Sequence, residues 1–175
     1  MTSTISLGGN PVHVAGNFPQ IGQTAPSFTL IGKGLADVAL SSFSGKRKVL
    51  NISQASIRRP ARPRYASSTR AQASWSNTLV LCISADLPFA QSVFAALKAW
   101  RMCLIFRPCA VASSSEAYGV ALSDGPLAGV AARAVIVLDE NDKVKKQPVG
   151  PGDQSEPDYD AALRVLGWNE AKHFT

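Results

Sequence analysis

Three cysteines, Cys82, Cys103 and Cys109, are the residues of this sequence that could do thiol chemistry. A cysteine thiolate attacks peroxides and disulfides, and paired cysteines bind zinc or form disulfides. The count here is odd and no Cys-x-x-Cys pair is present, so the sequence predicts neither a zinc site nor a disulfide framework. Cys82 lies within the apolar run LVLCISA and is interpreted as a small, inert, buried hydrophobe. A Cys103–Cys109 disulfide stays open as an alternative.

The two histidines are the other residues whose type could support metal binding. His13 and His173 lie far apart in the sequence, and neither has an evident metal partner beside it. We therefore expect each to be an ordinary surface histidine with its hydrogen bonds satisfied. Neither a metal site nor a cofactor is predicted.

The formal net charge of +6 raises the question of nucleic-acid binding. The charge is uneven, because the segment from Val38 to Ala85 holds eight basic and no acidic residues, whereas the rest holds ten basic and twelve acidic residues. Its stretch IRRPARPR has the composition of a nucleic-acid arm, but a solvated loop has it too. Without this segment no basic excess is left to form a binding face. We therefore expect no nucleic-acid partner and keep such binding only as a hypothesis to be tested.

The elements that must position these residues follow from length and hydrophobic pattern. With 175 residues, of which 46% are hydrophobic and 17% charged, the chain suits a single globular domain over 1–175. Two uninterrupted apolar runs, 77–85 and 133–139, are typical of central strands that are covered on both faces. Strands that alternate with presumed helices indicate an α/β domain with one mixed sheet.

The remaining segments predict the outer parts of this domain. We expect a β-hairpin over 4–15 with its turn at Gly-Asn-Pro, a loop over 25–30 leading into a strand, a strand pair formed by 37–40 and 46–52, a turn at 140–142 and a helix over 158–166. Residues 53–75 and 94–115 follow neither period. Each of these two stretches lies where an α/β domain needs a helix, so local sequence contradicts the global pattern there.

No targeting or membrane segment is expected. No apolar run approaches the roughly 20 residues that cross a bilayer. The N-terminal MTSTISLGGN has no basic residue and no apolar core, so it does not have the pattern of a secretory signal. We therefore expect a cytoplasmic protein without a membrane partner.

Several stretches are similar to the bacterial thiol peroxidases, which are atypical two-cysteine peroxiredoxins. The similar stretches are APSFTL and GKRKVLNI within 25–52, NTLVLCISADLPFAQSVF at 77–94, AYGVALSDGPLAGVAARAVIVLDENDKV at 117–144 and EPDYDAAL at 156–163. They cover well over half of the chain at consistent spacing. The resemblance implies a thioredoxin-like (peroxiredoxin) α/β fold, with a mixed sheet flanked by helices and an N-terminal β-hairpin in 1–16, and a homodimer. Residues 168–175 form a tail that has no counterpart in the family.

The resemblance also implies a function, a thiol-dependent peroxidase that reduces hydrogen peroxide and organic hydroperoxides with thioredoxin as donor. The family's peroxidatic cysteine falls at Ala61, the threonine three positions before it at Arg58, and the resolving cysteine at Ala95. Arg133, within AARAVIV, matches the catalytic arginine of the family; the alternative is a structural, ion-paired arginine at a strand edge. Because both reactive sulfurs are absent, we expect no peroxidase turnover from the chain as written.

A shifted reading frame would explain this loss. For one choice of codons, a single T added before Ser53 converts SQASIRRPARPRYASST into FPSIDTPTCATSVRKFN, which is similar to the family segment with its cysteine. A single T after Phe94 converts AALKAWRMCLIFRPCAVASS into the equally family-like CGAEGLENVPNLSTLRGREF. The hypothesis is that 53–75, 95–115 and 146–155 are frame-shifted, which would leave Cys103 and Cys109 without a role. The alternative is a catalytically dead, thioredoxin-like binding or structural protein.

Overall fold

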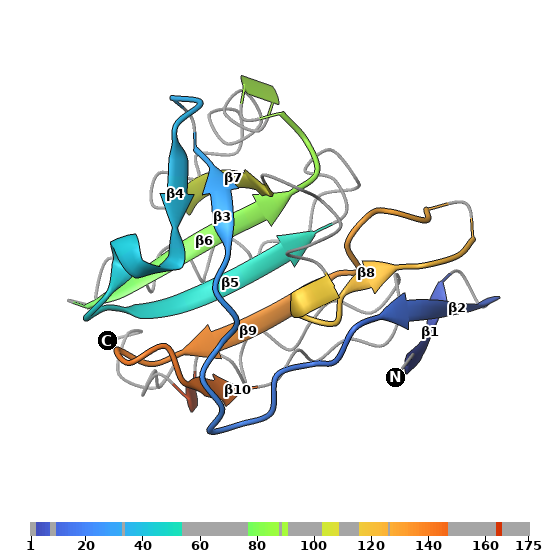
Figure 1. The fold of residues 1–175 in the computed structure, drawn as a ribbon, viewed down its shortest axis with the longest axis horizontal. Coiled ribbons are helices and arrows are strands. Elements are labelled where there is room, and N and C mark those ends of the chain that lie inside the picture. Colours follow the sequence, from blue (N-terminus) through green and yellow to red (C-terminus); the bar gives the residue numbers. More distant parts are fainter. Residues whose placement is uncertain are drawn as a thin grey trace, which may run out of the picture.

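The computed structural model of this chain describes residues 3–7, 10–32, 34–53, 77–87, 89–90, 103–108, 116–125, 127–146 and 164–165. Two β-sheets organise these residues (Figure 1). The larger has seven strands in the order β10-β9-β5-β6-β7-β3-β4, and the smaller has three in the order β1-β2-β8. No helix among the described residues is long and apolar enough to cross a membrane.

Three parallel strands form the middle of the larger sheet. Strand β6 (Thr78–Ser84) lies between β5 (Arg47–Ser53) and β7 (Cys103–Pro108) and is parallel to both. The outer strands run antiparallel to their neighbours: β9 (Ala134–Leu138) to β5, β10 (Val144–Lys146) to β9, β3 (Thr29–Ile31) to β7, and β4 (Asp37–Ala39) to β3. The sheet is therefore mixed, as predicted.

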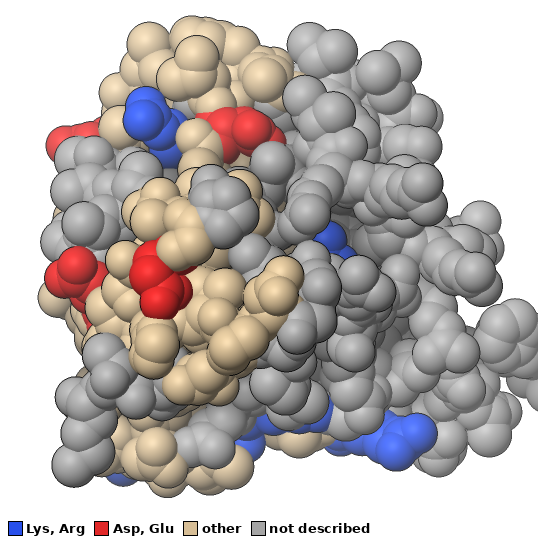
Figure 2. Space-filling view, turned by 90° about the vertical axis from the view of Figure 1, so that its right-hand side faces the viewer, with Lys and Arg blue, Asp and Glu red and all other residues tan. Residues whose placement is uncertain are grey.

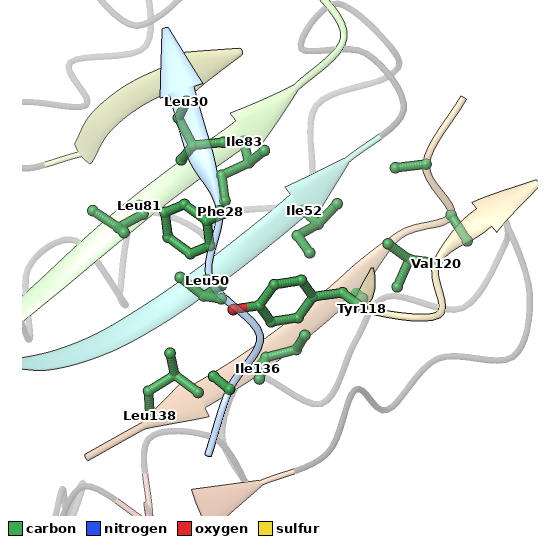
Figure 3. Packing of buried hydrophobic residues seen from close by; sticks show 14 of the residues in the cluster. Phe28, Leu30, Leu50, Ile52, Leu81, Ile83, Tyr118, Val120, Ile136 and Leu138 are labelled. Carbon is green, nitrogen blue, oxygen red and sulfur yellow. The ribbon is translucent and has the colours of Figure 1, made fainter. Parts of the chain in front are cut away.

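Both faces of the central strands are buried, which confirms what the two long apolar runs predict. One face packs against the segment that crosses it, which includes Phe28, Leu30 and the 3-10 helix η1 (Leu40–Phe43) (Figure 3). That face is formed by Leu50, Ile52, Leu81, Ile83, Ile136 and Leu138. On the opposite face Val49, Val80, Val135 and Val137 are buried as well.

The N-terminal hairpin is confirmed, with a different turn. Strands β1 (Ser3–Leu7) and β2 (Asn10–Ala15) are antiparallel, and β2 also pairs with β8 (Ala121–Leu122). Because Leu7 is paired with Asn10, Asn10 and Pro11 belong to the strand and only residues 8 and 9 separate β1 from β2. The Gly-Gly pair at 8–9 is itself a two-residue hairpin signal, and the strands are connected there rather than at the Gly-Asn-Pro turn that the sequence predicts.

Two predictions about pairing and local structure are wrong. Within and next to the predicted ranges 37–40 and 46–52 the strands β4 and β5 do form, but β4 pairs with β3, and β5 pairs with β6 and β9. The reason is the tight connection after β3, where the amide of Gly32 donates to the carbonyl of Ala36 at 3.0 Å and Leu35 has a φ of 58°. Within 94–115, where a helix is expected, the apolar residues CLIF form strand β7.

Most of the residues for which the sequence predicts flanking helices lie outside the described residues. Of the helix expected over 158–166, the structure describes residues 164 and 165, and both are helical. The tail at 168–175 lies outside the described residues.

Candidate active site

Arg133 lies at the carboxyl ends of the central parallel strands. It directly precedes β9, and the antiparallel register pairs the next residue, Ala134, with Ile52 near the end of β5. The last pair of β5 with β6 joins Ser53 to Ser84. Arg133 therefore lies at the sheet edge beyond which open α/β sheets bind their ligands. Its side chain is half-buried.

The described surroundings of Arg133 contain no charge partner for it. The ion pairs formed among the described residues join other side chains and leave this guanidinium out. The alternative of an ion-paired structural arginine thus finds no support in this part of the chain. A half-buried guanidinium at this edge could stabilise a thiolate and donate hydrogen bonds to peroxide oxygens. That role stays a prediction.

The other three predicted positions, Arg58, Ala61 and Ala95, lie outside the described residues. The segment that holds Arg58 and Ala61 starts directly after Ser53, and therefore leaves the sheet at the edge where Arg133 lies. Neither Ala61 nor Ala95 carries a sulfur, an oxygen or a nitrogen in its side chain. As written, the sequence provides no nucleophile at either matched position.

A second polar feature of this edge was missed from sequence. At the end of β6 the amide of Asp86 donates to the hydroxyl of Ser84 at 3.2 Å, and that hydroxyl is 3.3 Å from a carboxylate oxygen of Asp86. Ser84 is buried. This is a local serine turn, for which the signal is a Ser-x-Asp that ends an apolar run. It fixes the direction in which the chain leaves β6.

Cys82 is not the isolated, inert thiol that the sequence suggests. It is buried in the middle of β6, as expected, but its sulfur is disulfide-bonded. The bonded partner lies outside the described side chains. Because the chain has three cysteines, a bonded Cys82 also leaves no Cys103–Cys109 disulfide. The interpretation failed because local sequence does not show which cysteine side chains the fold brings together. A disulfide sulfur is not a thiolate nucleophile.

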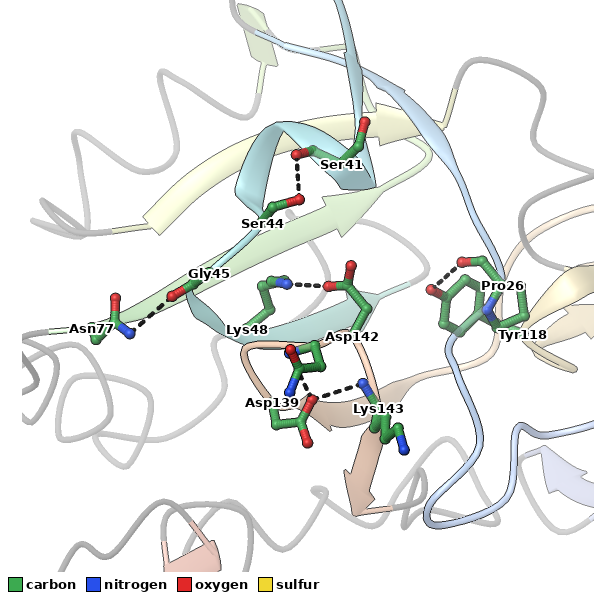
Figure 4. Close-up of polar contacts among 11 residues, drawn as sticks. Pro26, Ser41, Ser44, Gly45, Lys48, Asn77, Tyr118, Asp139, Asp142 and Lys143 are labelled. Atoms are coloured by element: carbon green, nitrogen blue, oxygen red, sulfur yellow. Dashed lines mark hydrogen bonds and ion pairs between the residues drawn. The ribbon is translucent and has the colours of Figure 1, made fainter.

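Tyr118 fastens the segment that crosses the sheet. Its hydroxyl donates to the carbonyl of Pro26 at 2.7 Å, and its ring is 6.1 Å from that of Phe28 (Figures 3 and 4). Burial raises the pKa of Tyr118 well above its usual value, and the negative charge of Asp142 raises this pKa further. The phenol is therefore a neutral hydrogen-bond donor in a structural role and does not act as a proton shuttle.

A buried ion pair marks the opposite, amino end of β5. The Lys48 side chain is completely buried and its ammonium group is ion-paired with the Asp142 carboxylate, while the carbonyl of Asp142 accepts a hydrogen bond from Ala25 at 2.8 Å (Figure 4). Lys48 is paired with Leu138 in the sheet register, far along β5 from Ile52 and Arg133. The pair therefore belongs to the scaffold that holds the crossing segment against the sheet.

His13 is an exposed histidine with a satisfied side chain, as expected. Its Nδ1 is 2.6 Å from one carboxylate oxygen of Asp124, and its amide donates to the other at 2.7 Å. The side-chain hydrogen bond with His13, followed by the backbone one, lowers the pKa of Asp124 below its usual value. His173 lies outside the described residues.

Most of the basic side chains of the basic segment lie outside the described residues. Of its eight basic residues the structure describes Lys46, Arg47 and Lys48; the arginines of IRRPARPR lie outside. Arg47 is 3.5 Å from the Glu140 carboxylate and Lys48 is paired with Asp142, so acidic residues compensate two of the three. On the face shown in Figure 2, described basic side chains lie near acidic ones at the top of the view, and further basic side chains lie along its lower edge.

Comparison with known proteins agrees with this geometry. The redoxin family model matches residues 20–163. A thiol peroxidase of Mycobacterium bovis is 37% identical over 166 residues, which cover 93% of this chain and 98% of that protein.

Two solved structures share the fold over nearly the whole chain. A peroxiredoxin-like protein from Aquifex aeolicus has a TM-score of 0.82 at 25% identity and covers 95% of this chain and 98% of its own. A thiol peroxidase from Chromobacterium violaceum has a TM-score of 0.81 at 23% identity, covering 97% and 98% respectively. These likenesses confirm the thioredoxin-like peroxiredoxin fold. Together with the sequence match over most of the chain, they show that this protein belongs to the redoxin family, and within it to the thiol peroxidases.

Proposed function

We propose that the gene of this chain specifies a thiol-dependent peroxidase, and that the chain as written has lost the activity because shifts of the reading frame removed both reactive sulfurs. One observation carries the proposal: Ala61 and Ala95 stand where the family has cysteines, while Arg133 keeps its place at the carboxyl edge of β5 and β6. The substrates would be hydrogen peroxide and organic hydroperoxides.

The reaction makes clear why the loss is complete. A cysteine thiolate attacks one peroxide oxygen, the O–O bond breaks, water or an alcohol leaves, and the sulfur becomes a sulfenic acid. A second thiol then displaces water from that sulfenic acid to form a disulfide, which a thioredoxin-type dithiol reduces by exchange. Every step passes through sulfur. Arg133 could lower the pKa of a nearby thiol and orient the peroxide, but it cannot accept the oxygen.

The setting of the proposed function follows from the family. We infer a cytoplasmic homodimer that takes peroxide as substrate and a thioredoxin-type protein as reductant, without a membrane or nucleic-acid partner. Similarity to thiol peroxidases over most of the chain supports these points. For nucleic acid, a titration with DNA at low salt gives a direct test, because binding by a basic segment would weaken steeply as salt is added.

The activity test compares two proteins in a peroxide-consumption assay with thioredoxin, thioredoxin reductase and NADPH. The chain as written should show no rate above the assay background. A gene with the frame of 53–75 and 95–115 restored should give a protein that oxidises NADPH when peroxide is added. Arg133→Gln in the restored protein should lower the rate by about 10²-fold, as expected for the loss of one charged donor. Turnover by the chain as written, or none by the restored protein, would contradict the proposal.

A catalytically dead binding or structural protein is the second candidate. It is favoured by the central strands β5, β6 and β9, which form a buried core in the chain as written. Resequencing the DNA that encodes residues 50–118 separates the two candidates. Single bases restored near Ser53 and Phe94 would support the peroxidase, and an unchanged sequence would favour the binding protein.

A further inference from the structure

The disulfide-bonded sulfur of Cys82 has two possible partners in the sequence. The chain has three cysteines, so the other half of this disulfide is Cys103 or Cys109. Cys82 lies in the middle of β6, where it is 8% exposed. A disulfide joins residues whose Cα atoms are about 4.4–6.8 Å apart. The partner must therefore come from a neighbouring part of the sheet, and the strand register limits the choice.

The register of β6 with β7 brings Cys103 close to Cys82. The two strands are parallel, and Cys82 is opposite Ile105. Two positions earlier, Val80 is opposite Cys103. Positions two apart on a strand share a face of the sheet, so Cys103 belongs to the face of Cys82 and is its diagonal neighbour. One strand spacing and two rises put the two Cα atoms roughly 8 Å apart in a flat sheet. A shift of roughly 1–2 Å at Cys103, the first residue of β7, brings them into disulfide range.

The same register disfavours Cys109, which follows the opposite end of β7. If the strand direction continued to Cys109, its Cα atom would be roughly 14 Å from that of Cys82. Pro108, the last residue of β7, is already roughly 11 Å away by the same spacings. Pro108 and Arg107 are also held in the sheet by pairing with β3. Cys109 would therefore have to turn straight back along the sheet from a fixed position, whereas Cys103 needs a small shift.

We propose that Cys82 and Cys103 form a disulfide that joins β6 to β7 and that opens and closes with the redox state of its surroundings. Closing oxidises the two thiols by two electrons. With hydrogen peroxide as oxidant, one sulfur takes an oxygen as the O–O bond breaks and the first water leaves. The second thiol then displaces a second water from this sulfenic acid as the S–S bond forms. Two thiols and one peroxide thus give one disulfide and two waters. A dithiol of the thioredoxin type reopens the bond by exchange and becomes a disulfide itself.

The bond acts on stability and does not form a catalytic cycle. Because Cys82 is buried, reagents reach it only when β7 separates locally from β6, which keeps both steps slow. Strand β7 also connects β3 and β4 to the rest of the larger sheet, so the bond holds these three strands to β6. In the unfolded chain it closes a loop of about 20 residues, which lowers the entropy of that state. The positions Ala61 and Ala95 take no part, so this inference is independent of the proposed peroxidase function.

Peptide mapping of the full chain identifies the bond without any substitution. The reduced chain is incubated with one molar equivalent of hydrogen peroxide until its free thiols stop changing, and is then unfolded in guanidinium chloride with N-ethylmaleimide. Chymotrypsin cleaves after Phe106 and so separates Cys103 from Cys109. We expect linked peptides that contain Cys82 and Cys103, and a labelled Cys109; reduction with dithiothreitol before labelling should give three labelled cysteines. A link between Cys82 and Cys109, or three labelled cysteines in the oxidised chain, would show that the proposal is wrong.

Two serine variants test the effect on stability. Cys109→Ser is the matched control for Cys103→Ser, because each removes one of the two possible partners. Dithiothreitol should lower the urea midpoint of the oxidised unsubstituted chain and of Cys109→Ser by about 1 M. The midpoint of Cys103→Ser should be low from the start and should not respond to dithiothreitol. A response in Cys103→Ser, or none in Cys109→Ser, would overturn the assignment, and the peptide map decides the question even if one variant does not fold.

Discussion

The buried pair of Lys48 and Asp142 allows a quantitative prediction about stability. The Lys48 side chain is 0% exposed and that of Asp142 is 22% exposed, so water reaches the carboxylate but not the ammonium group. Asp142→Asn leaves a buried ammonium group without its counter-charge, whereas Lys48→Met leaves a carboxylate that water can still reach. Asparagine suits the substitution because residue 142 has a φ of 60°, which asparagine tolerates.

The costs should therefore be unequal. We expect Asp142→Asn to lower the free energy of unfolding by about 3 kcal/mol or more, because one partner of a buried pair has been removed. Lys48→Met should cost about 1–2 kcal/mol, the usual penalty for one poorly satisfied polar group. The double variant should be close to Lys48→Met alone, since replacing both partners removes the unpaired charge. Lys145→Met is the matched surface control: its ammonium is 3.3 Å from Asp139, its side chain is 53% exposed, and it should cost about 0–1 kcal/mol.

Urea denaturation of the four variants at neutral pH measures these differences. With a slope of about 1–3 kcal/mol per molar urea, a loss of 3 kcal/mol moves the midpoint by about 1 M or more, which is easily resolved. Equal costs for the two single variants would refute the reasoning from burial. Costs that simply add in the double variant would refute the coupling between the two residues.

Three further predictions concern single contacts. Gly119→Ala should strongly lower the free energy of unfolding in the same urea assay, because φ is +63° and a Cβ would lie 2.5 Å from backbone atoms. Gly45→Ala is the matched control, with a φ of +76° and nothing within 4 Å of the added Cβ, and it should cost roughly 1–2 kcal/mol. Tyr118→Phe should cost about 1 kcal/mol in thermal unfolding, because the partly buried carbonyl of Pro26 loses its donor. The hydrogen bonds with His13 lower the pKa of Asp124 in the folded state. The ionised carboxylate therefore stabilises the fold above the usual pKa of 3.8, and this stabilisation is lost as pH falls through the folded pKa. The urea midpoints of Asp124→Asn and of the unsubstituted chain should converge in acid.

Strands that are buried on both faces were predictable because their signal is local. The runs at 77–85 and 133–139 contain β6 and β9, and the hairpin at the N-terminus follows from turn residues between alternating strands. Pairing partners were not predictable in the same way. Strand β4 pairs with β3 because of a tight turn at 32–36, and nothing local in 37–40 or 46–52 excludes the pairing that the sequence suggested.

The candidate site shows the same division. That Ala61 and Ala95 bring no sulfur is decided by residue type and by spacing from similar stretches, with no need of coordinates. That Arg133 lies at the carboxyl edge, beside the end of β5, depends on the antiparallel register of β9 with β5. The disulfide at Cys82 likewise depends on which cysteine the fold brings close to it, which is a non-local property.

The sequence by itself determined the family, the α/β class, the central strands and the missing nucleophile, because these depend on residue type and short-range pattern. Only the tertiary structure decided which charges are buried and which strands pair. Lys48, in GKRKVLNI, has the local sequence of a solvated cation, yet it is buried because Asp142, 94 residues later, provides the counter-charge. Strand pairing depends on the tertiary structure for the same physical reason: the partners of β5, like the counter-charge of Lys48, come from segments that are distant in sequence, and no short window of residues contains them.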